Sequence, residues 1–249
     1  MKFVIPVFLL LNSVISTSIL RTQDVCQSGT AQSPVDFNSV PVNIQQSNIK
    51  IIYEKITGHM AWNQKLKSFN ILLRNNQKAL YKVEFYPVDM KTDKITNVKK
   101  EYNLHSVSFK IISEHMIKGK SSPMEIQFIH QITKTDSKYS YNRLAFSVLV
   151  EPTDDEPDKL LENVLPDSHF EMSGFISALN GSPYFHYLGA SIASPCSEDV
   201  NWFVFTKIFK ISQGVYDAMV DMVQKQTGQK TNNKPVKPLA QRKVYKFGQ

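Results

Sequence analysis

The sequence has few of the residues on which metal or thiol chemistry usually depends. Its 249 residues include only two cysteines and six histidines. The histidines stand at positions 59, 105, 115, 130, 169 and 186, so no His-x-His or His-x-x-x-His spacing is present. No Ser-His-Asp or Cys-His pattern of a covalent hydrolase is evident either. These absences disfavour a locally encoded zinc site and a nucleophilic enzyme.

After its first residues the chain also lacks long apolar runs, internal repeats, low-complexity segments and Gly/Ser linkers. A length of 249 residues with 42% hydrophobic residues is consistent with one large globular domain. Lys2, the apolar run 3–11 and small residues at 16–18 are typical of a secretory signal. An uncleaved membrane anchor is the alternative, but the run is short for a span. We therefore expect a signal peptide at 1–18, a domain at 19–249 and secretion, with no membrane-spanning segment after signal removal.

The balance of charge is basic, with a formal net charge of +7. Such a surface attracts polyanions such as glycosaminoglycans, although a generally soluble basic surface is the simpler interpretation. The positive charges are scattered, so a nucleic-acid patch is not expected. In a secreted chain the even pair Cys26 and Cys196 suggests one disulfide, although the sequence alone does not show that they meet. The segment Asn180-Gly181-Ser182 is a candidate glycosylation site, with Pro183 following it.

Short runs rich in Val, Ile, Phe and Tyr predict a strand-dominated domain. The predicted strands cover residues 49–53, 69–73, 83–86, 102–112, 125–132, 144–150 and 202–209. One helix is predicted from Pro157, where Leu160, Leu161 and Val164 share a face. A second is predicted between a Ser212 cap and a stop at Gly228.

Two of these strands have one apolar and one partly polar face. In residues 107–111 the apolar side chains alternate with Ser108 and Lys110. In residues 125–130 the side chains of Glu125, Gln127 and Ile129 share the partly polar face. Polar side chains that face the interior of a sheet need partners or water, which indicates a cavity there.

Four sequence blocks, in order, resemble the α-carbonic anhydrases over nearly the whole chain after the signal. They are Gln-Ser-Pro-Val-Asp at 32–36, Ser-Glu-His at 113–115 with Glu-Ile-Gln-Phe-Ile-His at 125–130, the stretch 184–202 with Ser-Pro-Cys-Ser-Glu at 194–198, and Asn-Asn-Lys-Pro-Val-Lys-Pro-Leu at 232–239 with Arg242. The resemblance implies a large twisted, mainly antiparallel sheet of about ten strands with peripheral helices, and an active site in a cone on one face. Cys26 and Cys196 fall where secreted members of the family form their single disulfide.

The family holds zinc with a His-x-His pair and a third histidine on the next strand. The resemblance places Ser108 and Lys110 at the pair and Gln127 at the third position. A hydroxyl is a poor zinc ligand, an amide carbonyl a weak one, and an ammonium repels a dication. We therefore expect no zinc cofactor.

Accessory positions of the family have changed as well. The threonine that orients zinc-bound hydroxide corresponds to Ile192, whereas its glutamate partner remains as Glu114. A small residue lining the carbon dioxide pocket corresponds to Phe146, which is expected to fill part of that pocket. The proton-shuttle histidine maps to residue 78 or 79, where neither Lys nor Ala shuttles protons well near neutral pH.

The polar residues that remain have two interpretations. Glu114, His115 and Glu125 form a buried structural network in the family, and the simpler interpretation keeps them in that role. The alternative places Lys110 at the former metal position, paired with Glu114 or Glu125. The predicted function is that of a secreted, non-catalytic binding or structural module whose partner is an unknown extracellular protein or a polyanion. The alternative is a carbonate dehydratase of weak or unconventional activity.

Overall fold

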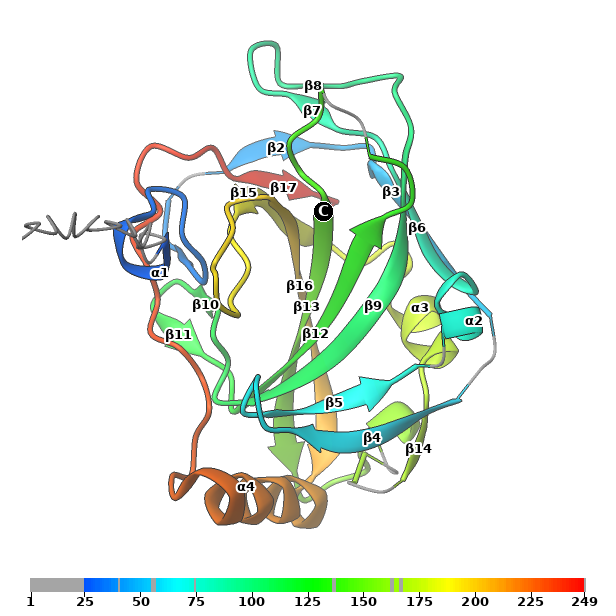
Figure 1. The fold of residues 1–249 in the computed structure, drawn as a ribbon, viewed down its shortest axis with the longest axis vertical. Coiled ribbons are helices and arrows are strands. Elements are labelled where there is room, and N and C mark those ends of the chain that lie inside the picture. The colour runs from blue at the N-terminus through cyan, green and yellow to red at the C-terminus, as the bar shows by residue number, and fades with distance from the viewer. Residues whose placement is uncertain are drawn as a thin grey trace, which may run out of the picture.

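A twisted twelve-stranded sheet forms the body of the molecule in the computed structural model (Figure 1). The structure describes residues 25–39, 41–54, 57–73, 75–135, 138–161, 164–165 and 168–248. The predicted signal peptide at 1–18 lies outside these residues. The mainly β prediction is confirmed.

The strands of the large sheet are built from distant parts of the chain. In spatial order they are β14 (His169–Glu171), β4 (Thr57–Asn63), β5 (Ser68–Leu72), β9 (Lys100–Ile111), β12 (Met124–Ile132), β13 (Arg143–Thr153), β16 (Val200–Ser212), β15 (Tyr184–Gly189), β17 (Tyr245–Phe247) and β2 (Val42–Ile44). Beside this path β3 (Ile49–Tyr53) pairs with β6 (Tyr81–Phe85), which pairs with β9. The pairs β13–β16 and β17–β2 are parallel and the others are antiparallel.

Smaller elements surround this sheet. A three-stranded sheet contains β1 (Asp36–Phe37), β10 (Met116–Ile117) and β11 (Lys120–Ser121), and a hairpin contains β7 (Val88–Asp89) and β8 (Lys94–Ile95). The helices are α1 (Val25–Ser28), α2 (Asn75–Lys78), α3 (Ser173–Leu179) and α4 (Gln213–Thr227), with a 3₁₀ turn η1 (Lys159–Leu161). None of the described helices combines the length and the apolar character that crossing a membrane requires.

The helix predicted after Ser212 is present as α4, and both of its predicted ends are correct. The Ser212 hydroxyl accepts a hydrogen bond from the backbone N–H of Val215 at 3.3 Å, which caps the first turn. Gly228 has a φ of 73°, the left-handed conformation in which many helices end. Glycine adopts it easily because it has no Cβ. The face with Met219 and Val223 is buried.

The α-helix predicted from Pro157 is wrong, because this segment contains only the short turn η1 among its described residues. The cause is a contact with β16. The Asp158 backbone N–H donates to the carbonyl of Lys210 at 2.9 Å, and the Asp158 carboxylate accepts from the Lys210 backbone N–H at 2.6 Å. Leu161 and Val164 are nevertheless fully buried, as their apolar character predicts.

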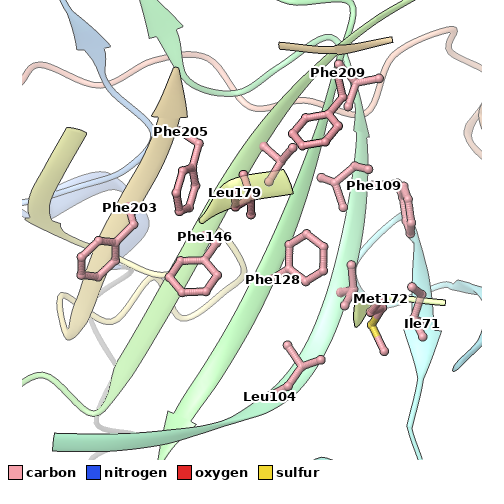
Figure 2. Packing of buried hydrophobic residues seen from close by; sticks show 14 of the residues in the cluster. Ile71, Leu104, Phe109, Phe128, Phe146, Met172, Leu179, Phe203, Phe205 and Phe209 are labelled. Atoms are coloured by element: carbon pink, nitrogen blue, oxygen red, sulfur yellow. The ribbon is translucent and has the colours of Figure 1, made fainter. Parts of the chain in front are cut away.

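The two faces of the sheet carry different hydrophobic clusters. On one face Phe128, Phe146 and Phe203 lie in register on β12, β13 and β16, as Figure 2 shows. On the other face a smaller cluster contains Ala145 and Trp202. Because side chains alternate along a strand, the second face is also the one that carries the polar residues of β9 and β12.

The disulfide between Cys26 and Cys196 is formed, which confirms the pairing suggested by the sequence. The two residues are separated by 170 positions in the sequence. The bond ties α1 to the loop between β15 and β16.

We predict that the Cys26→Ser/Cys196→Ser variant loses about 2–5 kcal/mol of unfolding free energy, because a long loop is no longer closed in the unfolded chain. Urea denaturation measures this loss. A reducing agent should destabilise the parent protein by the same amount as the double substitution does. It should not change the stability of the variant. Equal stability of variant and oxidised parent would contradict the prediction.

Candidate functional site

The structure brings together the three residues that the sequence predicts at the metal-ligand positions. Ser108 on β9 lies directly opposite Gln127 on β12, and Lys110 lies opposite Glu125. Directly opposed residues project their side chains from the same sheet face, so these four form one cluster. All four are buried, with at most 7% of any residue exposed.

Lys110 forms a buried ion pair with Glu114. Its Nζ lies 3.2 Å from Oε1 of Glu114, and the side chains are 9% and 0% exposed. The same Glu114 oxygen accepts a hydrogen bond from the backbone N–H of Lys234 at 3.0 Å. The other oxygen accepts from Nε2 of Gln127 at 2.8 Å. Both carboxylate oxygens are therefore occupied, and the ion pair considered from the sequence is formed with Glu114.

Glu125 is the second buried carboxylate of the cluster. One oxygen accepts from Nε2 of Gln127 and lies against Nδ1 of His115, each at 2.9 Å. The other accepts the backbone N–H groups of Glu114 and His115 at 2.7 and 2.9 Å. Burial alone would raise the pKa of Glu125, but His115 and these hydrogen bonds lower it to about 2. Glu125 is therefore ionised at neutral pH.

This network continues away from β12 through aromatic and hydroxyl groups. Nε2 of His115 lies 2.8 Å from the Tyr187 hydroxyl, which donates to Oγ of Ser33 at 2.8 Å. Ser33 Oγ also accepts from the backbone N–H of Ala190 at 3.0 Å. Sequence reasoning identified His115 as a structural residue but did not place Tyr187 or Ser33 beside it, although both stand within the quoted family blocks.

Ser108 is held from the side by polar residues of β5. Its Oγ lies 3.2 Å from that of Ser68, which donates to Oδ1 of Asn70 at 3.1 Å. Asn70 donates in turn to the carbonyl of Val107 at 3.1 Å. Ser68 and Asn70 were missed in the sequence, where their only signal is a two-residue polar alternation within an apolar run.

These side chains do not fit a divalent metal. The Gln127 Nε2 donates to both carboxylates, the Ser108 hydroxyl bonds to Ser68, and Lys110 contributes an ammonium. An ammonium has no lone pair to give and repels a cation. Within the described part of the chain, no three His, Cys, Asp or Glu side chains come together in an arrangement that could hold a metal ion.

Ile192 lies in the smaller hydrophobic cluster with Val200 and Trp202 and is 6% exposed. It offers no hydroxyl to Glu114. Of the two positions predicted for the proton shuttle, Lys78 is the last residue of α2 and Ala79 follows the helix.

The expectation that Phe146 fills a pocket beside this cluster is wrong. Phe146 is the cross-strand partner of Phe128 and Phe203, and all three face the opposite side of the sheet (Figure 2). Its neighbour Ala145 is the residue that faces the Gln127 side, opposite Trp202. If the sequence is matched to the family one residue out of place along β13, each position is assigned to the wrong face of the sheet. Such a shift explains the error.

Comparisons with known proteins point to one family. Residues 20–248 match the family described as "Eukaryotic-type carbonic anhydrase". Dioscorin dioA3 of Dioscorea japonica is 22% identical, covering 91% of this chain and 79% of that protein. Alpha carbonic anhydrase 4 of Arabidopsis thaliana is 24% identical, covering 89% and 76%. The solved structure of Photobacterium profundum alpha-carbonic anhydrase superposes with a TM-score of 0.66 at 19% identity, covering 90% and 93%.

We predict that Glu114→Gln lowers the unfolding free energy by about 3–5 kcal/mol, because the Lys110 ammonium is left buried without its carboxylate. The double variant Lys110→Met/Glu114→Gln should recover at least half of that loss, because no unbalanced charge remains. Urea denaturation of both single variants and the double variant measures the coupling. Purely additive losses would show that the two groups do not interact.

We also predict that acid destabilises the fold well before its carboxylates are protonated. Burial lowers the pKa of His130 to about 3 and that of His186 to about 4. Below pH about 6.5 the unfolded chain therefore binds protons that the folded protein cannot, so acid favours unfolding.

The unfolding free energy should fall by about 2 kcal/mol for each of these histidines between pH 7 and pH 5. Below pH about 4.5 the lowered pKa of Glu125 should add to the loss. Denaturation at several pH values measures the slope, and His186→Phe should make it shallower. Greater stability at pH 5 than at pH 7 would contradict this prediction.

Proposed function

The chain belongs to the eukaryotic-type carbonic anhydrase family, and we propose that it is a secreted member that binds or supports a partner and does not hydrate carbon dioxide. One observation carries the proposal. The sequence resemblance assigns Ser108, Lys110 and Gln127 to the zinc-ligand positions of the family, and the Lys110 ammonium is paired with Glu114.

The reaction of the family depends on a strong Lewis acid. Zinc held by three neutral imidazoles lowers the pKa of a bound water from about 15.7 to about 7, which makes hydroxide available at neutral pH. The difference of about nine units is equivalent to about 12 kcal/mol. Lys110 supplies one positive charge but coordinates no water, so it does not replace this step.

The groups around Lys110 are also unsuited to orient a nucleophilic water. Glu114 uses both oxygens for Lys110, Gln127 and the backbone of Lys234. Ile192 stands where the family has a hydroxyl that links water to this glutamate. The cluster therefore works as a structural connection between β9, β12 and the segment around residue 234.

Three features favour a role in binding or support: a buried hydrogen-bond network, a disulfide and a basic net charge. An unbroken series of contacts runs from Glu125 through His115 and Tyr187 to Ser33. In our proposal this network supports the fold and not a reaction. The disulfide is compatible with an oxidising compartment. The net charge of +7 suits an acidic extracellular protein or a polyanion as the partner.

The competing function is carbonate dehydration, because the matched family includes carbonic anhydrases such as the Arabidopsis relative. Metal analysis of the purified protein, together with stopped-flow hydration of carbon dioxide, separates the two. We expect less than one zinc per ten chains and no hydration above the buffer rate. Stoichiometric zinc with turnover that a sulfonamide inhibits would overturn the proposal.

Introducing histidines at the three positions tests whether they form the metal site. The variant Ser108→His/Lys110→His/Gln127→His should bind about one zinc per chain, because neighbouring positions on β9 and β12 then present three imidazoles. The control variant Lys110→His, with one imidazole, should bind none after dialysis. Equal zinc contents in parent and triple variant would show that these positions are not the metal site.

A further inference from the structure

A cavity lies away from the Lys110 cluster, where residues of the small sheet and of the large sheet meet. Its volume is about 720 Å³. Its lining residues come from β1, β10 and β11 of the small sheet and from β13, β15, β16, β17 and β2 of the large sheet. Ser108, Lys110, Gln127, Glu114 and Ile192 do not line it, so it is separate from the site described above.

The base of this cavity is apolar. Phe37 stacks on Phe185 at a ring-centroid distance of 4.8 Å, and Ile117 and Leu149 line the same space. Ile208 also lines it and is 41% exposed, which is unusual for an isoleucine in a central strand. Phe37 and Leu149 are already buried, at 3% and 4% exposed, so a ligand with a hydrocarbon part would mainly cover Ile208 and the half-buried Phe185.

Lysines contribute a positive charge to the lining. Lys118 and Lys120 come from the hairpin of β10 and β11, and Lys246 comes from β17. Lys118 has a φ of 53° and Gly119 a φ of 76°, so the hairpin turns through two left-handed residues. Positive φ at both central residues is typical of a two-residue hairpin loop.

Hydrogen bonds fix the tip of this hairpin. The backbone N–H of Gly119 donates to Oδ1 of Asp36 at 3.0 Å, and that of Lys118 donates to the carbonyl of Phe37 at 3.3 Å. A fixed turn holds its lysines near the apolar base before any ligand arrives, which lowers the entropic cost of binding.

The charge of the cavity is not balanced by its own acidic groups. Glu151 is the single carboxylate among the lining residues, and it pairs with Lys210 at 3.0 Å. Within the described residues, Lys118, Lys120 and Lys246 form no ion pair with a carboxylate. The cavity therefore combines an apolar base with three available ammonium groups.

We propose that this cavity binds an amphipathic organic anion, a carboxylate with a hydrocarbon chain of about ten carbons or more. The hydrocarbon chain lies over Phe185 and Ile208, and the carboxylate pairs with the lysines. The volume is in the range of about 300–1,000 Å³ that small-molecule sites have. A short anion would leave the apolar base uncovered, and a neutral lipid would cover the ammonium groups without pairing them.

Isothermal titration with sodium decanoate below its micelle concentration tests the site. The parent protein should bind one decanoate, and Lys120→Glu/Lys246→Glu should weaken binding about tenfold or more. Lys118 is left unchanged to preserve the left-handed turn. The control Lys94→Glu/Lys225→Glu changes the net charge equally at exposed lysines outside the cavity, and it should bind like the parent.

Two further comparisons test the hydrocarbon part. Ile208→Ser should weaken decanoate binding severalfold, and acetate or decanol should bind at least tenfold more weakly than decanoate. The proposal is overturned if decanoate does not bind the parent protein or if the lysine variant binds decanoate as tightly as the parent does. It is also overturned if acetate or decanol binds as tightly as decanoate. Zinc content and hydration report on the Lys110 cluster alone, so failure here leaves the proposed function untouched.

Discussion

Charge balance in the interior is the constraint on which the centre of this structure depends. Glu114 and Glu125 are both buried, and a buried ionised carboxylate is stable only with positive or hydrogen-bonding partners. Glu125 obtains them from His115, Gln127 and two backbone N–H groups. Glu114 obtains them from Lys110, Gln127 and the backbone of residue 234. The register of β9 against β12 places all of these groups within reach of one another.

This constraint explains why a lysine suits a position that faces two carboxylates. In our proposal the ammonium of Lys110 keeps a positive charge where the family has a dication, so the inherited carboxylates stay satisfied. An apolar residue there would leave Glu114 with hydrogen bonds alone. The buried network of Glu114 and Glu125 is thus satisfied by groups of the chain itself.

Much of the fold could be predicted because local patterns decide it. Apolar runs identified the long strands, and Ser212 and Gly228 identified the ends of α4. The segment after Pro157 could not be predicted, since a contact between Asp158 and the distant Lys210 decides its conformation. Periodicity placed Ser108, Lys110 and Gln127 on shared faces, whereas Phe146 was misplaced because its face depends on a register that one sequence does not fix. The neighbours of Ser108 on β5 leave only a short polar alternation in the sequence, and the lysine-lined cavity arises from the packing of segments that are far apart in the chain.

The position of β17 has a consequence for how the molecule is made. This strand, at residues 245–247, lies between β15 and β2, and β2 is formed by residues 42–44. Two strands from opposite ends of the described chain therefore complete one edge of the sheet together. Within the described residues, β2 pairs only with β17, so this edge of the sheet can assemble only after residues 245–247 have been synthesised.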